Sequence, residues 1–147
     1  MGMFSSFSHI YHPVRDLEES IDFYVNKLGF YMLRRYSTSP GRESCYVGLG
    51  GVLLELGTGN PPVPPADGRP LMRLGLTVSD LDVAIEDLKK KGVEVAIEPF
   101  DARTFWGRQG AIRDPNGYGI SLREWRRGDG PYFEGWQPAH EGVTRTG

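Results

Sequence analysis

The chain has 147 residues, 39% of them hydrophobic, and a formal net charge of −2 at pH 7, which is enough for one domain or two small halves that share a core. This charge argues against a nucleic-acid-binding surface, which is usually clearly basic. The single cysteine, Cys45, excludes an intramolecular disulfide and is typical of a reducing compartment. No signal peptide is recognised, and no apolar run approaches about 18 residues. We therefore expect a cytoplasmic protein that binds neither nucleic acid nor membrane.

The first half of the chain alternates between strand and helix patterns. Residues 8–14 are β-rich. Asp16 is a suitable helix N-cap, and apolar side chains then recur at helical spacing from 17 to 28. Gly29 follows where a helix end favours a residue that tolerates positive φ. Three further strands are predicted, the last two joined by a tight turn at Gly50 and Gly51; they cover residues 30–36, 44–49 and 52–56.

The second half repeats this order. A strand at 71–78 is followed by a helix at 80–91 that ends at Gly92. Three more strands are predicted at residues 93–97, 110–113 and 118–123. The sequence Asp-Pro-Asn-Gly at 114–117 predicts the last hairpin turn. Both halves are therefore predicted to be βαβββ modules, and the fold class is α+β.

The repeat is also visible in the residues themselves. Residues 14–18 recur as 78–82 at an offset of 64 (78 minus 14), and this register sets His9 opposite Arg73. A second alignment, of 51–56 with 117–122, has an offset of 66 (117 minus 51) and sets Glu55 opposite Ser121. A histidine and a carboxylate in the first half thus correspond to an arginine and a serine in the second.

Composition predicts the boundaries of these parts. The first module covers residues 1–57 and the second covers 71–127, and together they form one domain. The linker at 58–70 is rich in proline, which favours extended backbone. The tail at 128–147 has no clear periodicity but contains Tyr132, Phe133 and Trp136. We expect 131–136 to pack back on the body and the last four residues to fray.

Five short segments carry a family resemblance: 9–17, 23–24, 28–30, 106–108 and 114–117. Together they resemble the vicinal oxygen chelate superfamily, which includes glyoxalases, bleomycin-resistance proteins and extradiol dioxygenases. The resemblance covers roughly residues 7–125. It implies two tandem βαβββ modules that form a half-open barrel around a cavity. It also implies a frequent, though not universal, homodimer.

The resemblance further implies four metal-ligand positions, which hold His9, Glu55, Arg73 and Ser121 in this chain. Arginine stays protonated and repels a cation, and a serine hydroxyl is a weak neutral donor. A catalytic zinc-type site needs about three protein ligands. We therefore predict no metal cofactor; the alternative is a divalent metal at His9 and Glu55 supported by further ligands.

Strand alternation directs several of these side chains toward the implied cavity. The predicted ligand-binding residues are His9, Tyr11, Glu55, Arg73, Trp106, Ser121 and Arg123. Two interpretations of the charges remain open. Glu55 and Arg73 form a buried ion pair in place of the metal, or the two arginines bind an anionic small molecule. His12 is predicted to point away from His9, toward the helix layer.

Three functions are consistent with these residues. The first is a metal-free binding protein of the bleomycin-resistance type, which sequesters or carries an organic, in one interpretation anionic, ligand. The second is a glyoxalase-like metal-dependent lyase or isomerase, or a dioxygenase. The third is a metal-free enzyme in which the candidate catalytic residues His9 or Glu55 act as general base.

Overall fold

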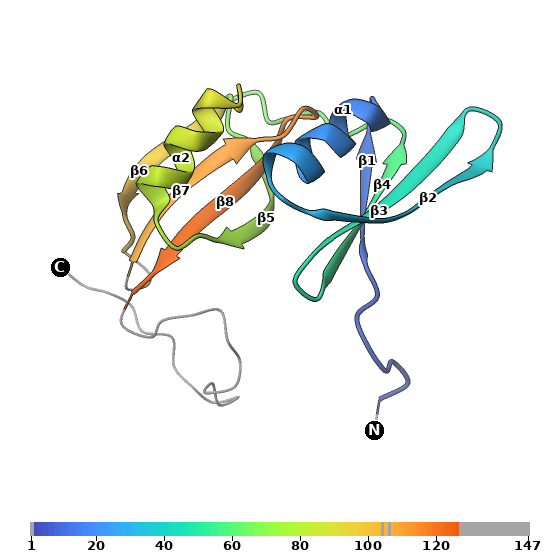
Figure 1. Ribbon diagram of the computed structural model, residues 1–147, viewed down its shortest axis with the longest axis horizontal. Coiled ribbons are helices and arrows are strands. Elements are labelled where there is room, and N and C mark those ends of the chain that lie inside the picture. The colour runs from blue at the N-terminus through green and yellow to red at the C-terminus, as the bar shows by residue number, and fades with distance from the viewer. Residues whose placement is uncertain (1, 104, 106, 127–147) are drawn as a thin grey trace. The chain divides into compact units, whose positions relative to one another are not determined.

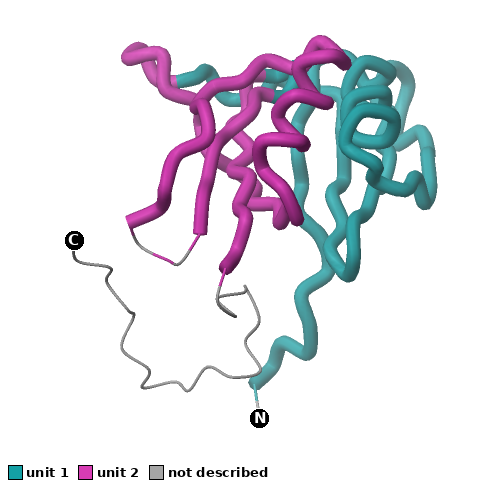
Figure 2. The backbone as a smooth tube through the Cα atoms, turned by 60° about the vertical axis from the view of Figure 1, so that its left-hand side comes forward, with its two compact units in different colours: residues 1–64, 114–116 teal, residues 65–113, 117–147 magenta. Residues whose placement is uncertain are grey.

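The computed structural model describes residues 2–103, 105 and 107–126, shown in Figure 1. The chain divides into two compact units, coloured separately in Figure 2. The first contains residues 1–64 together with 114–116, and the second contains 65–113 and the chain from 117 on. The predicted ligand-binding residue Trp106 and the predicted aromatic tail lie outside the described residues.

The first unit is built on a four-stranded mixed sheet. Its elements are β1 (Ile10–Val14), α1 (Leu17–Ile21), the π-helix η1 (Asp22–Lys27), β2 (Tyr31–Ser39), β3 (Arg42–Leu49) and β4 (Val52–Thr58). The strand order is β1-β4-β3-β2, with β1 parallel to β4 and the other pairs antiparallel. The order of elements is the predicted βαβββ.

The first helix begins as predicted but changes its winding halfway. Asp16 caps it, because its Oδ1 accepts a hydrogen bond from the Glu19 backbone N–H at 3.0 Å. From Asp22 the helix widens, and Leu28 N–H donates to Phe23 C=O five residues back. In this widened turn the neighbouring side chains of Phe23 and Tyr24 are both buried. The predicted regular helix to residue 28 is wrong in this respect, since the apolar spacing carries no signal for the extra residue per turn.

A buried polar network ties the turn at 114–116 into the first unit. His12 is fully buried, and its Nε2 lies 3.1 Å from Asp114 Oδ2. Tyr24 Oη donates to the same oxygen at 2.8 Å. Asn116 accepts from Arg15 N–H at 2.9 Å and donates to Ser20 Oγ at 3.1 Å. As predicted, His12 faces the helix side of the sheet, among core residues rather than with His9.

The second unit repeats the architecture. Its elements are β5 (Leu71–Thr77), α2 (Leu81–Lys90), β6 (Val95–Asp101), β7 (Gly107–Arg113) and β8 (Tyr118–Trp125), in the sheet order β5-β8-β7-β6. Asp80 caps α2 by accepting from Val83 N–H at 3.0 Å. In Figure 1, α2 lies across one face of this sheet. Leu81, Ile85 and Leu88 of α2 are buried together with Ile112, Ile120 and Leu122 of the strands.

Two details of the second sheet differ from the prediction. The β5–β8 register shifts between Met72 and Leu74, which makes Arg73 the extra residue of a β-bulge. Strand β7 begins at Gly107 instead of 110, and β6 runs to Asp101. The α+β class and the two βαβββ modules are confirmed; neither four-stranded sheet is a closed barrel, as a half-open barrel requires. No helix in the described part of the chain has the length and apolarity to span a membrane.

Candidate functional site

In the first unit, the sheet face opposite the helices carries a row of large side chains. Across the sheet, Arg34 pairs with Tyr46, Tyr46 with Glu55, and Glu55 with Tyr11. Residues in register point to the same face, so these four side chains form one cross-strand row. The Tyr11 ring packs over Gly57, where an added Cβ would lie 2.8 Å from the ring. This row fills the centre of the open face.

Glu55 is the centre of a hydrogen-bonded cluster on this face. Tyr36 Oη donates to Glu55 Oε1 at 2.6 Å, and His9 Nε2 lies 3.0 Å from Glu55 Oε2. His9 Nδ1 lies 2.8 Å from Ser8 Oγ. A neutral His9 with its proton on Nε2 would satisfy both contacts, by donating to Glu55 and accepting from Ser8. Ser8, His9, Glu55 and Tyr36 thus form a continuous chain of polar groups.

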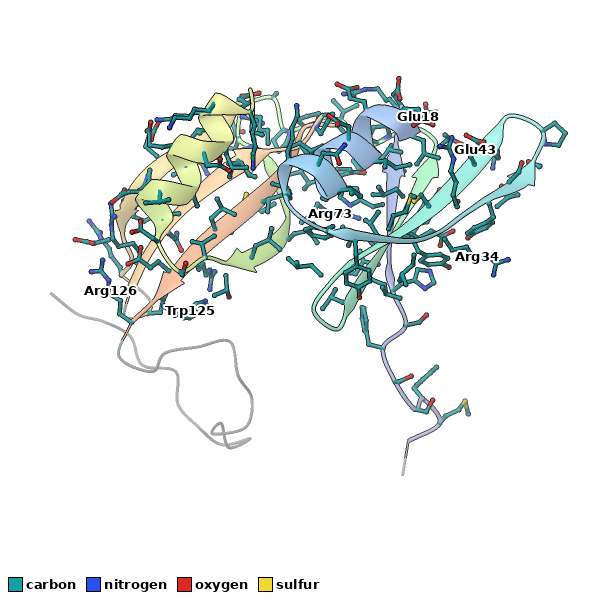
Figure 3. All side chains as sticks on the ribbon, viewed as in Figure 1. Glu18, Arg34, Glu43, Arg73, Trp125 and Arg126 are labelled. Carbon is teal, nitrogen blue, oxygen red and sulfur yellow. The ribbon has the colours of Figure 1, made fainter. Side chains whose placement is uncertain are left out.

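Aromatic rings and a cation surround this cluster. Tyr36 stacks on Tyr46 with ring centroids 5.9 Å apart, and Arg34 Cζ lies 5.5 Å from the Tyr36 ring. The hydrogen bond to Glu55 is the main cause that raises the pKa of Tyr36 above its ordinary value, with smaller contributions from Tyr46 and burial. Tyr36 is therefore a neutral hydrogen-bond donor near pH 7. Figure 3 shows Glu18 and Glu43 on the helix side of the β2–β3 ribbon and Arg34 on the opposite side.

The equivalent row in the second unit combines one isoleucine, at its edge, with three small residues. Ile97 pairs with Ala111, Ala111 with Ser121, and Ser121 with Gly75. These positions correspond by topology to Arg34, Tyr46, Glu55 and Tyr11 of the first sheet. A Cβ added at Gly75 would meet no atom within 4 Å. The described side chains of this row consequently leave the centre of the open face uncovered, whereas those of the first sheet cover it.

A cavity of about 440 Å³ lies over this row. Its lining combines two arginines, two neutral polar side chains, apolar side chains and glycine backbone; the residues are Met72, Arg73, Leu74, Gly75, Ile97, Phe100, Gln109, Gly110, Ala111, Ser121 and Arg123. None of these described lining residues is acidic. The cavity therefore offers positive charge and hydrogen-bond donors beside an apolar wall.

Aromatic rings pack against both arginines. Arg73 Cζ lies 5.3 Å from the centre of the Tyr118 ring. Arg123 Cζ lies 5.1 Å from the Phe105 ring and 5.5 Å from the Trp125 ring. Figure 3 labels Arg73, and it places Trp125 at the end of β8. Within the described part of the second unit, no carboxylate forms an ion pair with Arg73 or Arg123.

The structure therefore gathers the predicted residues into two groups. His9, Tyr11 and Glu55 belong to the first unit, whereas Arg73, Ser121 and Arg123 line the cavity of the second. The pairing of Glu55 with Arg73 joins residues of different units and stays a prediction, as does the role of every residue in ligand binding.

Sequence reasoning missed Tyr36, Tyr46 and Gln109. Tyr36 and Tyr46 lie within predicted strands, and the pairing register of those strands would have shown that both lie near Glu55. Gln109 lies just before the predicted strand at 110–113, whereas β7 includes it.

The described residues at the predicted metal-ligand positions include two side chains that suit a divalent cation. His9 and Glu55 can both bind a cation, but the corresponding positions of the second module hold Arg73 and Ser121. Within each unit, the residues that the structure describes contain no group of three or more His, Cys, Asp or Glu that could hold a metal ion. Because about three protein ligands are needed for a zinc-type site, the metal-free state stays a prediction that metal analysis can test.

The fold defines a domain built from two tandem βαβββ modules, each with one open sheet face. The chain belongs to the Glyoxalase/Bleomycin resistance protein/Dioxygenase superfamily, whose family model matches residues 6–122. The family resemblance drawn from the sequence is thereby confirmed.

The relatives of this chain include both enzymes and a binding protein. The chain is 32% identical over 127 residues to lactoylglutathione lyase of Neisseria meningitidis, which covers 82% of this chain and 91% of that protein. It is also similar to the crystal structure of TnmS3, an antibiotic-binding protein from Streptomyces sp. CB03234, with 32% identity, a TM-score of 0.61 and coverage of 82% and 98%. The trypanothione-dependent glyoxalase I of Leishmania major aligns with 27% identity and a TM-score of 0.62, covering 79% of this chain and 84% of that one.

Proposed function

We propose that the protein binds a small organic molecule without a metal, in the manner of the bleomycin-resistance branch of its superfamily, and sequesters or carries it. One observation carries the proposal. Where the first sheet holds Tyr46, Glu55 and Tyr11, the second holds Ala111, Ser121 and Gly75, and a cavity of about 440 Å³ takes the place of the larger side chains.

The size and lining of this cavity suit an organic ligand. Small-molecule sites are typically about 300–1,000 Å³, mainly apolar, with a few placed polar groups. Met72, Ile97 and Phe100 supply apolar surface, and Ser121 and Gln109 supply hydrogen bonds. The 32% identity to an antibiotic-binding protein favours the same general role.

Metal analysis separates this proposal from its main alternative. The purified protein is incubated with nickel, zinc, manganese or iron(II), dialysed, and analysed for bound metal, with His9→Ala as the matched variant. Our proposal expects less than stoichiometric metal in both proteins. Stoichiometric retention that disappears in His9→Ala would defeat it. A thermal-shift screen of organic ligands on the metal-free protein supplies the positive test.

The second candidate function is a glyoxalase-like metal-dependent lyase or isomerase, or a dioxygenase. It is favoured by the 32% identity to lactoylglutathione lyase and by the 3.0 Å contact between His9 and Glu55. These two residues would then hold the metal with further ligands, and the metal would supply Lewis-acid chemistry. The same dialysis experiment decides between the two candidates.

A third candidate is a metal-free acid–base enzyme. It is favoured by the chain of polar contacts from Ser8 through His9 and Glu55 to Tyr36. His9 and Tyr36 contact the two carboxylate oxygens of Glu55, which would take up the proton as general base. Turnover of an anionic carbonyl substrate by metal-stripped protein, lost in Glu55→Gln, would support it. A lack of turnover over a broad panel would count against it.

The proposal also covers the oligomeric state and the cellular compartment. We propose a cytoplasmic homodimer, on the strength of the superfamily resemblance and of a composition with one cysteine. Light scattering coupled to size-exclusion chromatography tests the dimer directly.

A further inference from the structure

We infer that the cavity of the second module selects organic anions, namely an aromatic ring or a short fused ring system that carries a carboxylate or sulfonate. This inference rests on the proposed function, because it names the ligand class of the same cavity. It goes beyond that function in requiring that charge, and not shape alone, decides which molecules bind.

The charges of the cavity are of one sign. Arg73 and Arg123 line it, and none of the other described lining residues is charged. The chain as a whole has a net charge of −2, so the positive charge of the cavity is opposite in sign to the net charge of the protein. Each arginine packs on aromatic rings, and no described carboxylate of the second unit pairs with either one. Two cations without a counterion among the described residues of their own unit favour an anionic partner.

The strand register places the two arginines on either side of the paired residues Gly75 and Ser121. Gly75 pairs with Ser121, Arg123 lies two residues further along β8, and Arg73 lies two residues earlier on the parallel strand β5. Because Arg73 is the extra residue of the bulge, it lies between the levels of Gly119 and Ile120 on β8. At a rise of about 3.3 Å per residue, the two arginine backbones are therefore roughly 10–13 Å apart along the strands. A guanidinium stacked on a ring keeps its in-plane N–H donors for a second partner, and that geometry matches a planar oxyanion.

The remaining lining explains why the anion should be aromatic. Met72, Ile97 and Phe100 form an apolar wall, on which a ring can pack. Gln109 pairs with Arg123 across β7 and β8, and with Phe100 across β6 and β7. A polar end and an apolar wall thus occur side by side in one cross-strand row. An inorganic anion would leave the apolar wall unused.

Matched probes test the inference directly. The probes are 2-naphthoate with its neutral isostere 2-naphthamide, and 2-naphthalenesulfonate with 2-naphthalenesulfonamide, measured by isothermal titration calorimetry on the full chain. Each anion should bind about tenfold more tightly than its neutral partner, which is the ratio expected from one additional charge-assisted hydrogen-bonded pair. High NaCl should weaken binding of the anions and leave the neutral probes almost unchanged. Acetate and sulfate should bind more weakly than either aromatic anion.

Three variants assign the effect to the cavity. The double variant Arg73→Gln/Arg123→Gln should lose the preference for anions, while the charge-conserving Arg73→Lys/Arg123→Lys should keep most of it. Gly75→Leu should block all four probes, because its side chain would enter the open space above the row without meeting protein atoms near its Cβ. Circular dichroism checks that each variant is folded, and the salt dependence of the wild-type protein tests the charge effect without any substitution.

The possible failures are distinguishable. If anionic and neutral probes bind the wild-type protein equally and Gly75→Leu blocks both, the anion inference is overturned and the proposed binding function stands. If no probe binds at millimolar concentration, or if Gly75→Leu leaves binding unchanged, both the inference and the proposed use of this cavity are overturned.

Discussion

The buried network around Asp114 gives a sharp prediction about stability. Tyr24 is fully buried, and its hydroxyl donates to Asp114 Oδ2 at 2.8 Å. The substitution Tyr24→Phe removes this hydroxyl and leaves the ring, which packs edge-on against Phe23 at 5.1 Å and Phe30 at 5.4 Å. The change therefore removes the polar contacts of the hydroxyl, which also lies 3.1 Å from His12 Nε2, and keeps the surrounding apolar packing.

The expected loss follows from the environment of that bond. A hydrogen bond to a charged group contributes about 1.5–3 kcal/mol. The Asp114 carboxylate retains the contact with His12 Nε2 at 3.1 Å and the Asn116 N–H at 2.8 Å, so the acceptor is not left without donors. We therefore expect the free energy of unfolding to fall by about 2 kcal/mol. For a chain of this length, that corresponds to roughly 4–8 °C in Tm.

Urea denaturation followed by far-UV circular dichroism measures this loss, with Tyr31→Phe as the matched control. Tyr31 is 45% exposed, and its hydroxyl donates to Gly50 C=O at 3.1 Å. Removing that hydroxyl should change the free energy of unfolding by no more than about 0.5 kcal/mol. The reasoning is refuted if both variants lose the same amount within error, because burial of the acceptor would then contribute nothing.

Two further predictions concern local chemistry. Glu55→Gln should lower the pKa of Tyr36 toward its ordinary value, as seen by ultraviolet difference titration with Tyr36→Phe as reference. Since the pKa of Tyr36 is raised in the folded state, its contribution to stability is present below pH ~10 and is lost as the pH rises further. Gly107→Ala should destabilise strongly in thermal unfolding, because its Cβ would fall on the Glu124 carbonyl oxygen, whereas Gly75→Ala should not. Equal Tm values for the two alanine variants would contradict this packing argument.

Local signals in the sequence were sufficient for most of the fold. Asp16 and Asp80 cap the two helices through their side chains, and Gly29 and Gly92 follow the helix ends with φ of 81° and 76°. These features depend on a few neighbouring residues, so spacing alone predicts them. The π-helix and the bulge at Arg73 have no counterpart in the apolar spacing of the sequence. The contacts of Asp114 with His12 and Tyr24, about a hundred residues away, were invisible for the same reason.

The candidate site was predictable only in part. The offset between the halves correctly set Glu55 opposite Ser121, since both lie on the fourth strand of their module and pair with equivalent strands. The other offset, of 64 (75 minus 11), sets Tyr11 opposite Gly75, but a single glycine in a strand does not by itself predict a cavity. The space above Gly75 depends on Ala111, which lies on a different strand, and on how far neighbouring side chains reach. Such information exists only once the register is known.

The sequence repeat is clear among residues on the helix side of each sheet and is lost among residues on the opposite face. On the helix side, Leu17 and Leu81 must both be buried, and the segments that contain them stayed recognisably alike. Packing imposes no such demand on the opposite face, where bulk and charge are free to differ. One module therefore holds Glu55 within a filled aromatic row, while the other combines small residues with Arg123. Both sheets keep the same strand order, and Tyr11 and Glu55 of the first sheet correspond to Gly75 and Ser121 of the second. Small side chains at these two positions therefore leave a cavity where large ones cover the first face.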